Sequence, residues 1–407
     1  MKRERRSRLG DLVVGVLALE RSIAGMLAMV VLVGMGEKLA ERFLPVYLVA
    51  LGGGALSVGL LNGLDNLLSA IYSLVGGHLA DRLGIKRSLL LFNAVAVLGF
   101  VIVIMVPTWP AVIAGSVLFL SWTAISLPAT MGLVAQVLPT GKRIMGVSMH
   151  SLVRRIPMAL GPLLGGVLID RLGIDVGIRT AFGVATALAF IAAVLQQQLI
   201  ENDAPTIVQA PSAVRPGRIL DSLNPALRRL LAADILIRSC EQIPYAFVVL
   251  WCLDTLAHPV TATQFGLLTA IEMTTALAIY VPVAWFADRG RKKPFVVMTF
   301  VFFTFFPVVL LFSHSFWSLA GAFVLRGLKE FGEPTRKALI MELAPEGKKA
   351  ATFGLYYLLR DTVVSVAAFG GAFLWRIDPS VNFLAAFACG AAGTIWFAWQ
   401  GQDENSR

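Results

Sequence analysis

Twelve stretches of mostly apolar residues follow one another along the chain, and short polar breaks separate them. A bilayer core about 30 Å thick needs roughly 20 apolar residues per helix, and each stretch has about that length. Hydrophobic residues make up 57% of the 407 residues and charged residues 15%, whereas soluble domains hold about 45–50% and about 25%. The sequence therefore predicts an all-α membrane protein with twelve transmembrane helices. These cover about 24–50, 56–77, 87–106, 111–136, 145–169, 177–199, 227–252, 263–287, 294–313, 316–341, 350–375 and 379–399.

Lysine and arginine residues collect in every second break, which predicts the orientation of the chain. Positively charged loops stay on the cytoplasmic side, so we expect both termini in the cytoplasm and the protein in the plasma or inner membrane, in contact with lipid. The apolar stretch after the basic N-terminus is too long for a signal peptide, so we expect this end to be retained. The net charge of +10 is spread over these breaks instead of one polar surface, so we expect no nucleic-acid partner.

The two halves of the sequence match each other. LADRLGIKR at 79–87 is similar to FADRGRKK at 286–293, and LPTGKR at 138–143 is similar to APEGKK at 344–349. Between the halves lies a polar stretch rich in proline, alanine and serine. We predict an N-terminal six-helix bundle over 1–199, a cytoplasmic linker over 200–226 and a C-terminal six-helix bundle over 227–407. Parallel repeats of this kind place a site between the halves near the midplane of the membrane.

The segment GGHLADRLGIKR at 76–87 resembles the signature loop of the major facilitator superfamily, and the resemblance covers the whole chain. It implies two pseudo-symmetric six-helix bundles that alternate in access, with this loop as a cytoplasmic latch between them. Ile85 departs from the pattern, which usually has a basic residue there. A loop whose charges only fix orientation would explain the basic residues but not the glycines. The latch residues are Gly77, Asp81, Arg82, Gly84, Lys86 and Arg87, with Asp288 and Arg289 in the second half.

The segment PMALGPLLGG at 157–166 is similar to a motif of the exporters in that superfamily, with Pro157 where a glycine is usual. Small residues at this spacing also serve close packing between helices. The motif favours export only mildly. The membrane-embedded arginine of drug/proton antiporters is absent from helix 4, which weakens any transfer of their mechanism.

Carboxyl groups lie inside several predicted helices, where a charge costs about 2.5–3.5 kcal/mol unless it faces protein or water. Several follow the repeat, since Glu37 and Glu241 are 204 residues apart and Asp65 and Glu272 are 207 apart. Crowded carboxylates in a medium of low dielectric constant take up protons easily. We therefore predict that these four carry coupling protons, and the alternative is a purely structural network.

Intramembrane arginines suggest an anionic or zwitterionic solute. The predicted solute-binding residues are Arg42, Arg155, Arg238, Arg360, Glu330 and Tyr245. Helix 10 carries Arg326, Glu330, Glu333 and Lys337 at a spacing that places them on one face of a helix, where structural ion pairing is the alternative. Asp234 and Arg238 are also spaced to pair.

The sequence predicts a secondary transporter that exports a small organic solute in exchange for protons. The alternative is an importer or uniporter of an organic anion that uses the arginines, and a remote alternative is a membrane sensor or scaffold that transports nothing. We expect no enzyme activity, because no P-loop, nucleophile elbow or nucleotide fingerprint appears. We also expect no cofactor, no metal and a monomer.

Overall fold

The computed structural model describes residues 21–120, 122–137, 143–200, 224–287, 292–345 and 349–401. The predicted latch residues Asp288 and Arg289 and most of the predicted linker lie outside these ranges. Each of the twelve predicted stretches contains helix. The first half holds α2 (Arg21–Glu41), α3 (Leu44–Ala50), α4 (Gly54–Leu83), α5 (Ile85–Met105), α6 (Trp109–Phe119), α7 (Trp122–Val137), α8 (Arg143–Leu172) and α9 (Ile174–Leu199). The second holds α11 (Pro225–Tyr245), α12 (Phe247–Leu250), the π-helical turn η2 (Trp251–Thr255), α13 (Ala262–Ala287), α14 (Lys292–Leu311), α15 (Phe316–Leu328), the 3₁₀ turn η3 (Lys329–Gly332), α16 (Glu333–Leu343), α17 (Lys349–Ile377) and α18 (Pro379–Gln400).

Among the described residues, length and apolarity identify fewer membrane-spanning helices than the predicted twelve. Within the described residues, nine helices are long and apolar enough to cross a membrane, or ten if Pro225–Tyr245 and Phe247–Thr255 form one bent span. The two remaining predicted spans are α4, which carries Asn62, Asp65 and Asn66, and α15–η3–α16, which is interrupted and charged. Polar residues lower the hydropathy of both. The all-helical membrane fold is confirmed, and the count of twelve is not.

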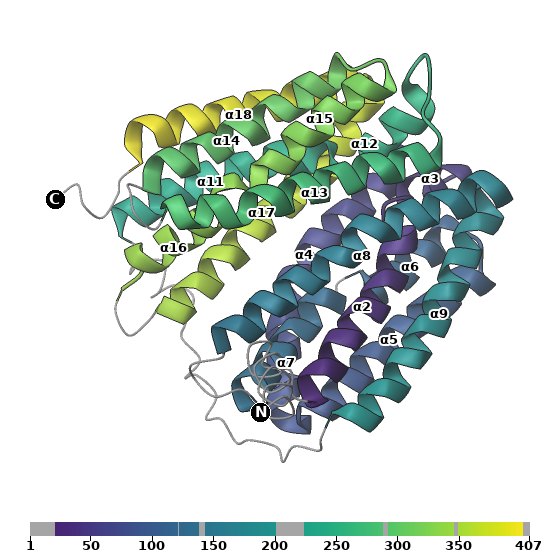
Figure 1. Ribbon diagram of the computed structural model, residues 1–407. Helices are drawn as coiled ribbons and strands as arrows, with labels where there is room; N and C mark the ends of the chain where they lie inside the picture. The colour runs from purple at the N-terminus through teal and green to yellow at the C-terminus, as the bar shows by residue number, and fades with distance from the viewer. Residues whose placement is uncertain are drawn as a thin grey trace, which may run out of the picture.

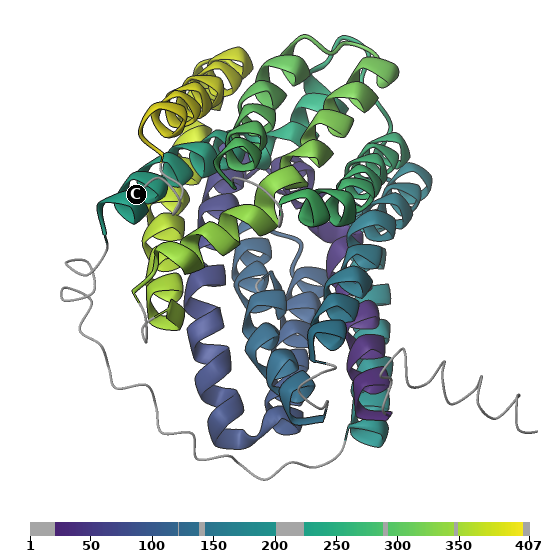
Figure 2. The same ribbon diagram turned by 60° about the vertical axis from the view of Figure 1, so that its left-hand side comes forward.

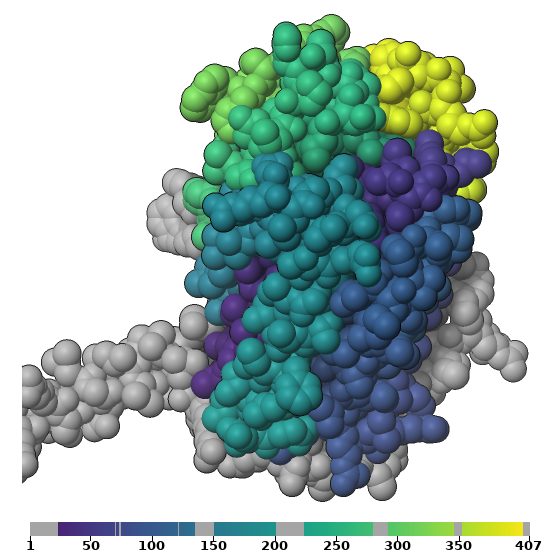
Figure 3. All heavy atoms as spheres, turned by 90° about the vertical axis from the view of Figure 1, so that its right-hand side faces the viewer, coloured from purple at the N-terminus to yellow at the C-terminus, as the bar shows by residue number. Residues whose placement is uncertain are grey.

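The helices form two groups that meet along two pairs of helices. In the first group α2 packs on α8 and α9, and in the second α11 packs on α17 and α18. Between the groups, α8 packs on α13 and α4 packs on α17, and Figure 1 shows the groups as a purple-to-teal body and a green-to-yellow body. Seen from the side, their surfaces meet without a break (Figure 3).

The two groups converge at one end of the molecule and diverge at the other (Figures 1 and 2). We call the converging end, which holds the turns at 51–53, 106–108, 256–261 and 378, the far end. We call the opposite end, where α9 stops and α11 starts, the linker end. By the charge pattern, the linker end is expected to face the cytoplasm.

Glycines bring the backbones of the two groups together near the far end. A Cβ atom built on Gly166 of α8 would lie 2.3 Å from the carbonyl oxygen of Ala262, and one on Gly266 of α13 would lie 2.4 Å from the carbonyl oxygen of Pro162. No other residue fits such an approach. Gly165 packs in the same way against Leu39 of α2. The glycines of the exporter-like segment therefore serve close packing in this structure.

Three helices are interrupted in the middle of the bundle. The first predicted helix breaks at Arg42–Phe43, between α2 and α3, and the seventh breaks at Ala246, between α11 and α12. Arg42 and Ala246 are 204 residues apart, the same spacing as Glu37 and Glu241. The tenth helix is broken by η3, and Pro334 is the second residue of α16, which follows. Interrupted helices are tolerated in a membrane where they line a cavity or are buried in protein.

Candidate functional site

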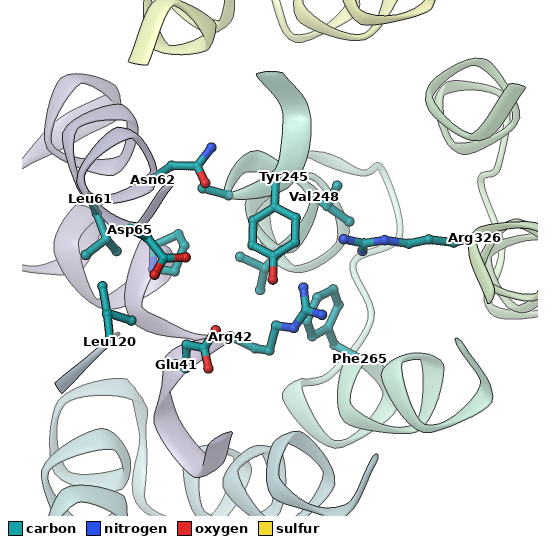
Figure 4. Close-up of a pocket in the computed structure, with 13 residues that line it drawn as sticks. Glu41, Arg42, Leu61, Asn62, Asp65, Leu120, Tyr245, Val248, Phe265 and Arg326 are labelled. Atoms are coloured by element: carbon teal, nitrogen blue, oxygen red, sulfur yellow. The ribbon is translucent and has the colours of Figure 1, made fainter. Parts of the chain in front are cut away.

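A pocket with about 480 Å³ of empty space lies between the two groups of helices, beside these breaks. Its walls come from both groups, and Figure 4 shows the polar side chains that point into it. Much of the lining is apolar, with leucine, valine and phenylalanine side chains around a few charged groups. The lining residues are Glu41, Arg42, Pro45, Leu61, Asn62, Asp65, Leu120, Tyr245, Ala246, Val248, Val249, Phe265 and Arg326. An apolar cavity with a few convergent polar groups is the usual form of a small-molecule site.

Tyr245 lies between two guanidinium groups. The Arg42 guanidinium carbon is 4.8 Å from the centre of the Tyr245 ring, and that of Arg326 is 5.3 Å away. Such cation–π contacts stabilise a buried cation by about 0.5–2 kcal/mol. Arg326 also faces Glu272 at 3.3 Å, so its charge is balanced by a carboxylate. Within the described residues, no carboxylate forms an ion pair or hydrogen bond with Arg42.

Asp65 enters the pocket from α4, and it differs from the other predicted proton carriers. Among the described residues no hydrogen bond or ion pair of its carboxylate is found. The charged groups that face it are Glu37, Lys38, Glu41 and Arg42. In the described part of the chain, Asp65 is therefore a carboxylate in a largely apolar pocket without a hydrogen bond or ion pair of its own.

The other three predicted proton carriers are held by basic side chains. Glu37 accepts from Lys38 at 3.0 Å and from the Thr123 hydroxyl at 3.4 Å. Glu241 accepts from Lys329 at 2.7 Å and also pairs with Arg238. Lys329 lies 3.3 Å from Glu272 as well, so one lysine joins these two carboxylates. Lys38 also pairs with Glu41, which links Glu37 to the pocket wall.

A second buried cluster lies away from the pocket, around Asp234. Its carboxylate accepts from Arg336, from Arg360 at 3.4 Å and from the Tyr356 hydroxyl at 3.1 Å. The expectation that Asp234 pairs with Arg238 is therefore wrong. Arg360, predicted to bind solute, is instead held by Asp234 and by Asp361 at 2.7 Å. Its position favours a structural role.

The predicted charge stripe on helix 10 is also wrong, because η3 interrupts the helix in its middle. Arg326 pairs with Glu272 of another helix, and Glu330 pairs with Arg155 of α8 at 3.1 Å. Of the predicted pairs, only Glu333 and Lys337 lie near each other, at 3.8 Å. Among the ion pairs of the described residues, Arg155–Glu330 is the one that joins the two groups of helices. Neither residue lines the pocket.

The signature segment forms the tight connection from α4 to α5 at the linker end. Gly84 has φ of +81°, a conformation that favours glycine, and its N–H closes α4 by donating to Ala80. Lys86 is buried and donates to the carbonyl oxygen of Gln197 at 2.8 Å, so it ties α5 to α9 instead of reaching lipid headgroups. Gly77 packs against Pro128. Asp81, Arg82 and Arg87 are exposed, and the latch role of the segment stays a prediction.

Residues 26–256 and 235–407 match the model of the Major Facilitator Superfamily. The chain belongs to this family. It is 27% identical over 381 residues to the multidrug resistance protein MdtG of Salmonella arizonae, covering 90% of each chain. It is 19% identical over 359 residues to the MFS-type transporter MJ1317 of Methanocaldococcus jannaschii, covering 86% of this chain and 87% of that one. A crystal structure of a peptide transporter POT in complex with sulfate shares the fold, with a TM-score of 0.75, 14% identity and 94% of each chain covered.

The protein is thus a multi-pass membrane transporter, and the residue chemistry of its pocket is partly what the sequence predicted. Arg42, Asp65 and Tyr245 line the pocket together, while Arg155, Arg238, Arg360 and Glu330 do not. Glu41, Asn62, Phe265 and Arg326 were not among the predicted site residues. Glu41 and Arg326 carry intramembrane charge and lie within one turn of a helix break, a combination that could have identified them. In the described parts of the chain, no three histidine, cysteine or acidic side chains gather as metal ligands.

Proposed function

We propose that the protein is a proton-coupled exporter of small organic solutes, with the central pocket as the solute site and Asp65 as the coupling carboxyl. The observation that carries this proposal is the contrast among the four candidate carboxylates. Glu37, Glu241 and Glu272 each face at least one basic side chain within hydrogen-bond or ion-pair distance, whereas Asp65 has none at that distance among the residues that the structure describes. A carboxylate held by a cation resists protonation, while a lone carboxylate in an apolar pocket is easier to neutralise.

The coupling follows from competition at one carboxylate. With Asp65 ionised, a solute that carries a basic group finds an opposite charge in the pocket. With Asp65 protonated, that attraction is lost and the solute leaves. Proton and solute therefore exclude each other, so each conformational cycle exchanges one for the other. This competition fixes the direction of the pH dependence. Solute affinity is highest at pH values where Asp65 is ionised, and it falls as the pH decreases.

The direction of transport rests on the relatives and on the charge pattern. The name of MdtG associates that relative with multidrug resistance, which supports efflux of organic compounds here. The basic breaks support a cytoplasmic linker end, so a pocket reached from the linker end would load from the cytoplasm. In an energised plasma membrane, protons entering through Asp65 would then drive the solute outward.

An importer or uniporter of organic anions is the second candidate, and Arg42 favours it. This guanidinium lines the pocket and contacts the Tyr245 ring, with no carboxylate partner among the described residues. Arg155, Arg238 and Arg360 are each neutralised by an acidic side chain and are less suited to an anionic solute. An anion carrier would depend on Arg42 and keep its activity when Asp65 is replaced.

The test compares Asp65→Asn with the unaltered protein in proteoliposomes that have an acidic lumen. A pH-sensitive dye in the lumen reports proton release when tetraphenylphosphonium, benzoate or aminomethyl-benzoic acid is added outside. We expect solute-dependent proton release from the unaltered protein and none from Asp65→Asn, whose neutral side chain mimics protonated Asp65 and should weaken the binding of solutes that carry a basic group. Asp175→Asn is the matched control, because Asp175 is an exposed acid whose partners are Tyr47 and Arg179.

The melting temperatures of the three proteins are measured as a control, to detect a folding defect that would also abolish proton release. Gradient-driven transport by Asp65→Asn at the unaltered rate would remove Asp65 from the mechanism. Transport of benzoate alone, dependent on Arg42 and indifferent to the gradient, would favour the second candidate.

A further inference from the structure

We infer that the solute is a zwitterion with an apolar body, whose ammonium group binds Asp65 and whose acidic group binds Arg42. This inference rests on the proposed transport through the pocket and names the class of its substrate. Figure 4 shows the Asp65 carboxylate and the Arg42 guanidinium facing the same open space from different walls, with the Tyr245 hydroxyl between them. Both line the pocket, and within the described residues neither has an ionic partner.

The other charged groups of the pocket are neutralised within the protein. Glu41 pairs with Lys38, and Arg326 pairs with Glu272. One anion and one cation are therefore left for the solute. A ligand of a single charge would pair with one of them and leave the other desolvated without a partner, which is costly in an apolar site.

The surroundings add charge mainly on one side of the pocket. On the side of Asp65, Lys38 pairs with Glu37 and Glu41, and Arg154 also faces Glu37, so two basic groups face two carboxylates. On the side of Arg42, three basic groups face two carboxylates, which leaves one excess positive charge; they are Arg238, Arg326 and Lys329 with Glu241 and Glu272. Arg42 adds to this positive excess, and Asp65 supplies the negative charge of the pocket. A zwitterion with its acidic group toward Arg42 and its ammonium group toward Asp65 is aligned with this field.

The apolar part of the lining indicates that the solute has an apolar body. Leu61, Leu120, Val248, Val249 and Phe265 form the apolar part of the same pocket wall, and those labelled in Figure 4 lie on either side of the charged groups. Burial of an apolar body there is favourable by about 25 cal/mol per Å². A small, fully polar zwitterion would forgo this contribution, so we expect an aromatic or aliphatic body between the two charges.

Equilibrium binding to the purified full-length protein tests the inference with compounds that differ only in charge. Three bodies of increasing length are used: aminomethyl-benzoic, aminomethyl-naphthoic and aminomethyl-biphenylcarboxylic acid. For each body, titration calorimetry compares the zwitterion with its methyl ester, its N-acetyl derivative and the doubly capped neutral form. On at least one body, we expect the zwitterion to bind about 10- to 150-fold more tightly than either singly capped form, the range for a hydrogen bond to a charged group.

Two variants test which residue binds the ammonium group of the solute and which binds its acidic group. In Asp65→Asn the zwitterion should lose its advantage over the N-acetyl acid and keep its advantage over the methyl ester. In Arg42→Gln the pattern should reverse, and Asp175→Asn should leave all ratios unchanged. Because the pattern concerns ratios between compounds, a partial loss of folded protein does not mimic it. If Arg42→Gln fails to fold, the compound series on the unaltered protein decides alone.

Equal or tighter binding of the cation, the anion or the neutral form on all three bodies would overturn the inference, as would absence of binding by every zwitterion. Its failure is separable from failure of the exporter proposal, since no gradient is present in this experiment. Proton-driven transport of a singly charged solute would refute the zwitterion inference and support the exporter proposal. A preference for zwitterions without proton-driven transport would support the binding-site inference and refute the exporter proposal.

Discussion

Asp170 closes the far end of the transporter by capping a helix of the opposite half, and its removal should shift the balance between conformations. It lies near the end of α8, and its two carboxylate oxygens accept from the backbone N–H groups of Ala262 and Thr263, each at 2.9 Å. These are the first residues of α13, whose N-terminus attracts negative charge. Thr261 and Gln264 satisfy each other in the same turn. The first turn of α13 therefore depends on α8 for two of its hydrogen bonds.

The magnitude follows from the cost of losing a helix cap, about 0.5–2 kcal/mol. Asp170 is exposed to solvent, which screens its charge, so we take the lower half of that range, about 0.5–1 kcal/mol. The contact joins α8 to α13, so we expect opening of the far end to break it, and the whole amount then acts on the conformational equilibrium. Asp170→Ala should therefore raise the ratio of far-end-open to far-end-closed molecules roughly 2- to 5-fold.

Electron–electron double resonance between spin labels measures this ratio. Exposed positions for the labels are Met105 at the far end of α5 and Trp317 at the start of α15, on opposite halves. We expect Asp170→Ala to increase the population at the longer distance, and Asp175→Ala, which loses contacts only within the first half, to leave it unchanged. An unchanged distance distribution in Asp170→Ala, with the label positions verified by the unaltered protein, would refute the capping argument.

Two further predictions concern the linker end and the orientation of the chain. Asp81→Asn should leave the protein folded, as judged by its melting temperature, but should enrich forms open at the linker end and lower transport, because the predicted latch loses its charge; normal transport would reduce the loop to a signal for orientation. Single cysteines placed near 53, 108 and 258 should react with an impermeant reagent from outside intact cells, and those near 84, 210 and 291 only after permeabilisation, and the reverse pattern would invert the assigned orientation.

The fold class could be predicted from sequence because it depends on composition and length. A chain with this many apolar stretches folds in a lipid bilayer. There, only helices and closed barrels can form hydrogen bonds with all of their backbone N–H and C=O groups. The presence of Arg42, Asp65 and Tyr245 in one pocket was also within reach, since charged residues inside a membrane helix must face protein or water. The sequence alone could not predict which of these charged side chains would lack an ionic partner among the described residues.

Ion-pair partners could not be predicted, because spacing along a helix is informative only while the helix is continuous. The stripe from Arg326 to Lys337 assumes a regular α-helix, and the 3₁₀ turn η3 interrupts that regularity between its two parts. Arg326 and Glu330 then find partners on α13 and α8. Asp234 likewise has a suitable arginine one turn away but pairs with Arg336 and Arg360 from other helices. Tertiary packing decided each of these pairs.

Local sequence also leaves the role of a motif undecided. The tetrapeptide Asp-Arg-Leu-Gly occurs at 81–84 and again at 170–173, and both times it ends a helix with a glycine at φ of +81°. At the far end, Asp170 meets the start of α13 from the opposite half. At the linker end, where the halves diverge, Asp81 is exposed. The same four residues therefore form an inter-half contact only where another helix begins opposite them.

The pocket is asymmetric although it is built beside a pair of helix breaks that follow the repeat. Arg42 and Ala246 occupy equivalent breaks, 204 residues apart, and the preceding residues are Glu41 and Tyr245. Repeat symmetry therefore places two helix breaks beside one cavity. The side chains there differ, however: one half contributes a charged pair and the other contributes an aromatic ring on which Arg42 rests. Because equivalent positions hold different chemistry, the two halves contribute unlike side chains to the same cavity, and repeat symmetry does not extend to the lining of the pocket.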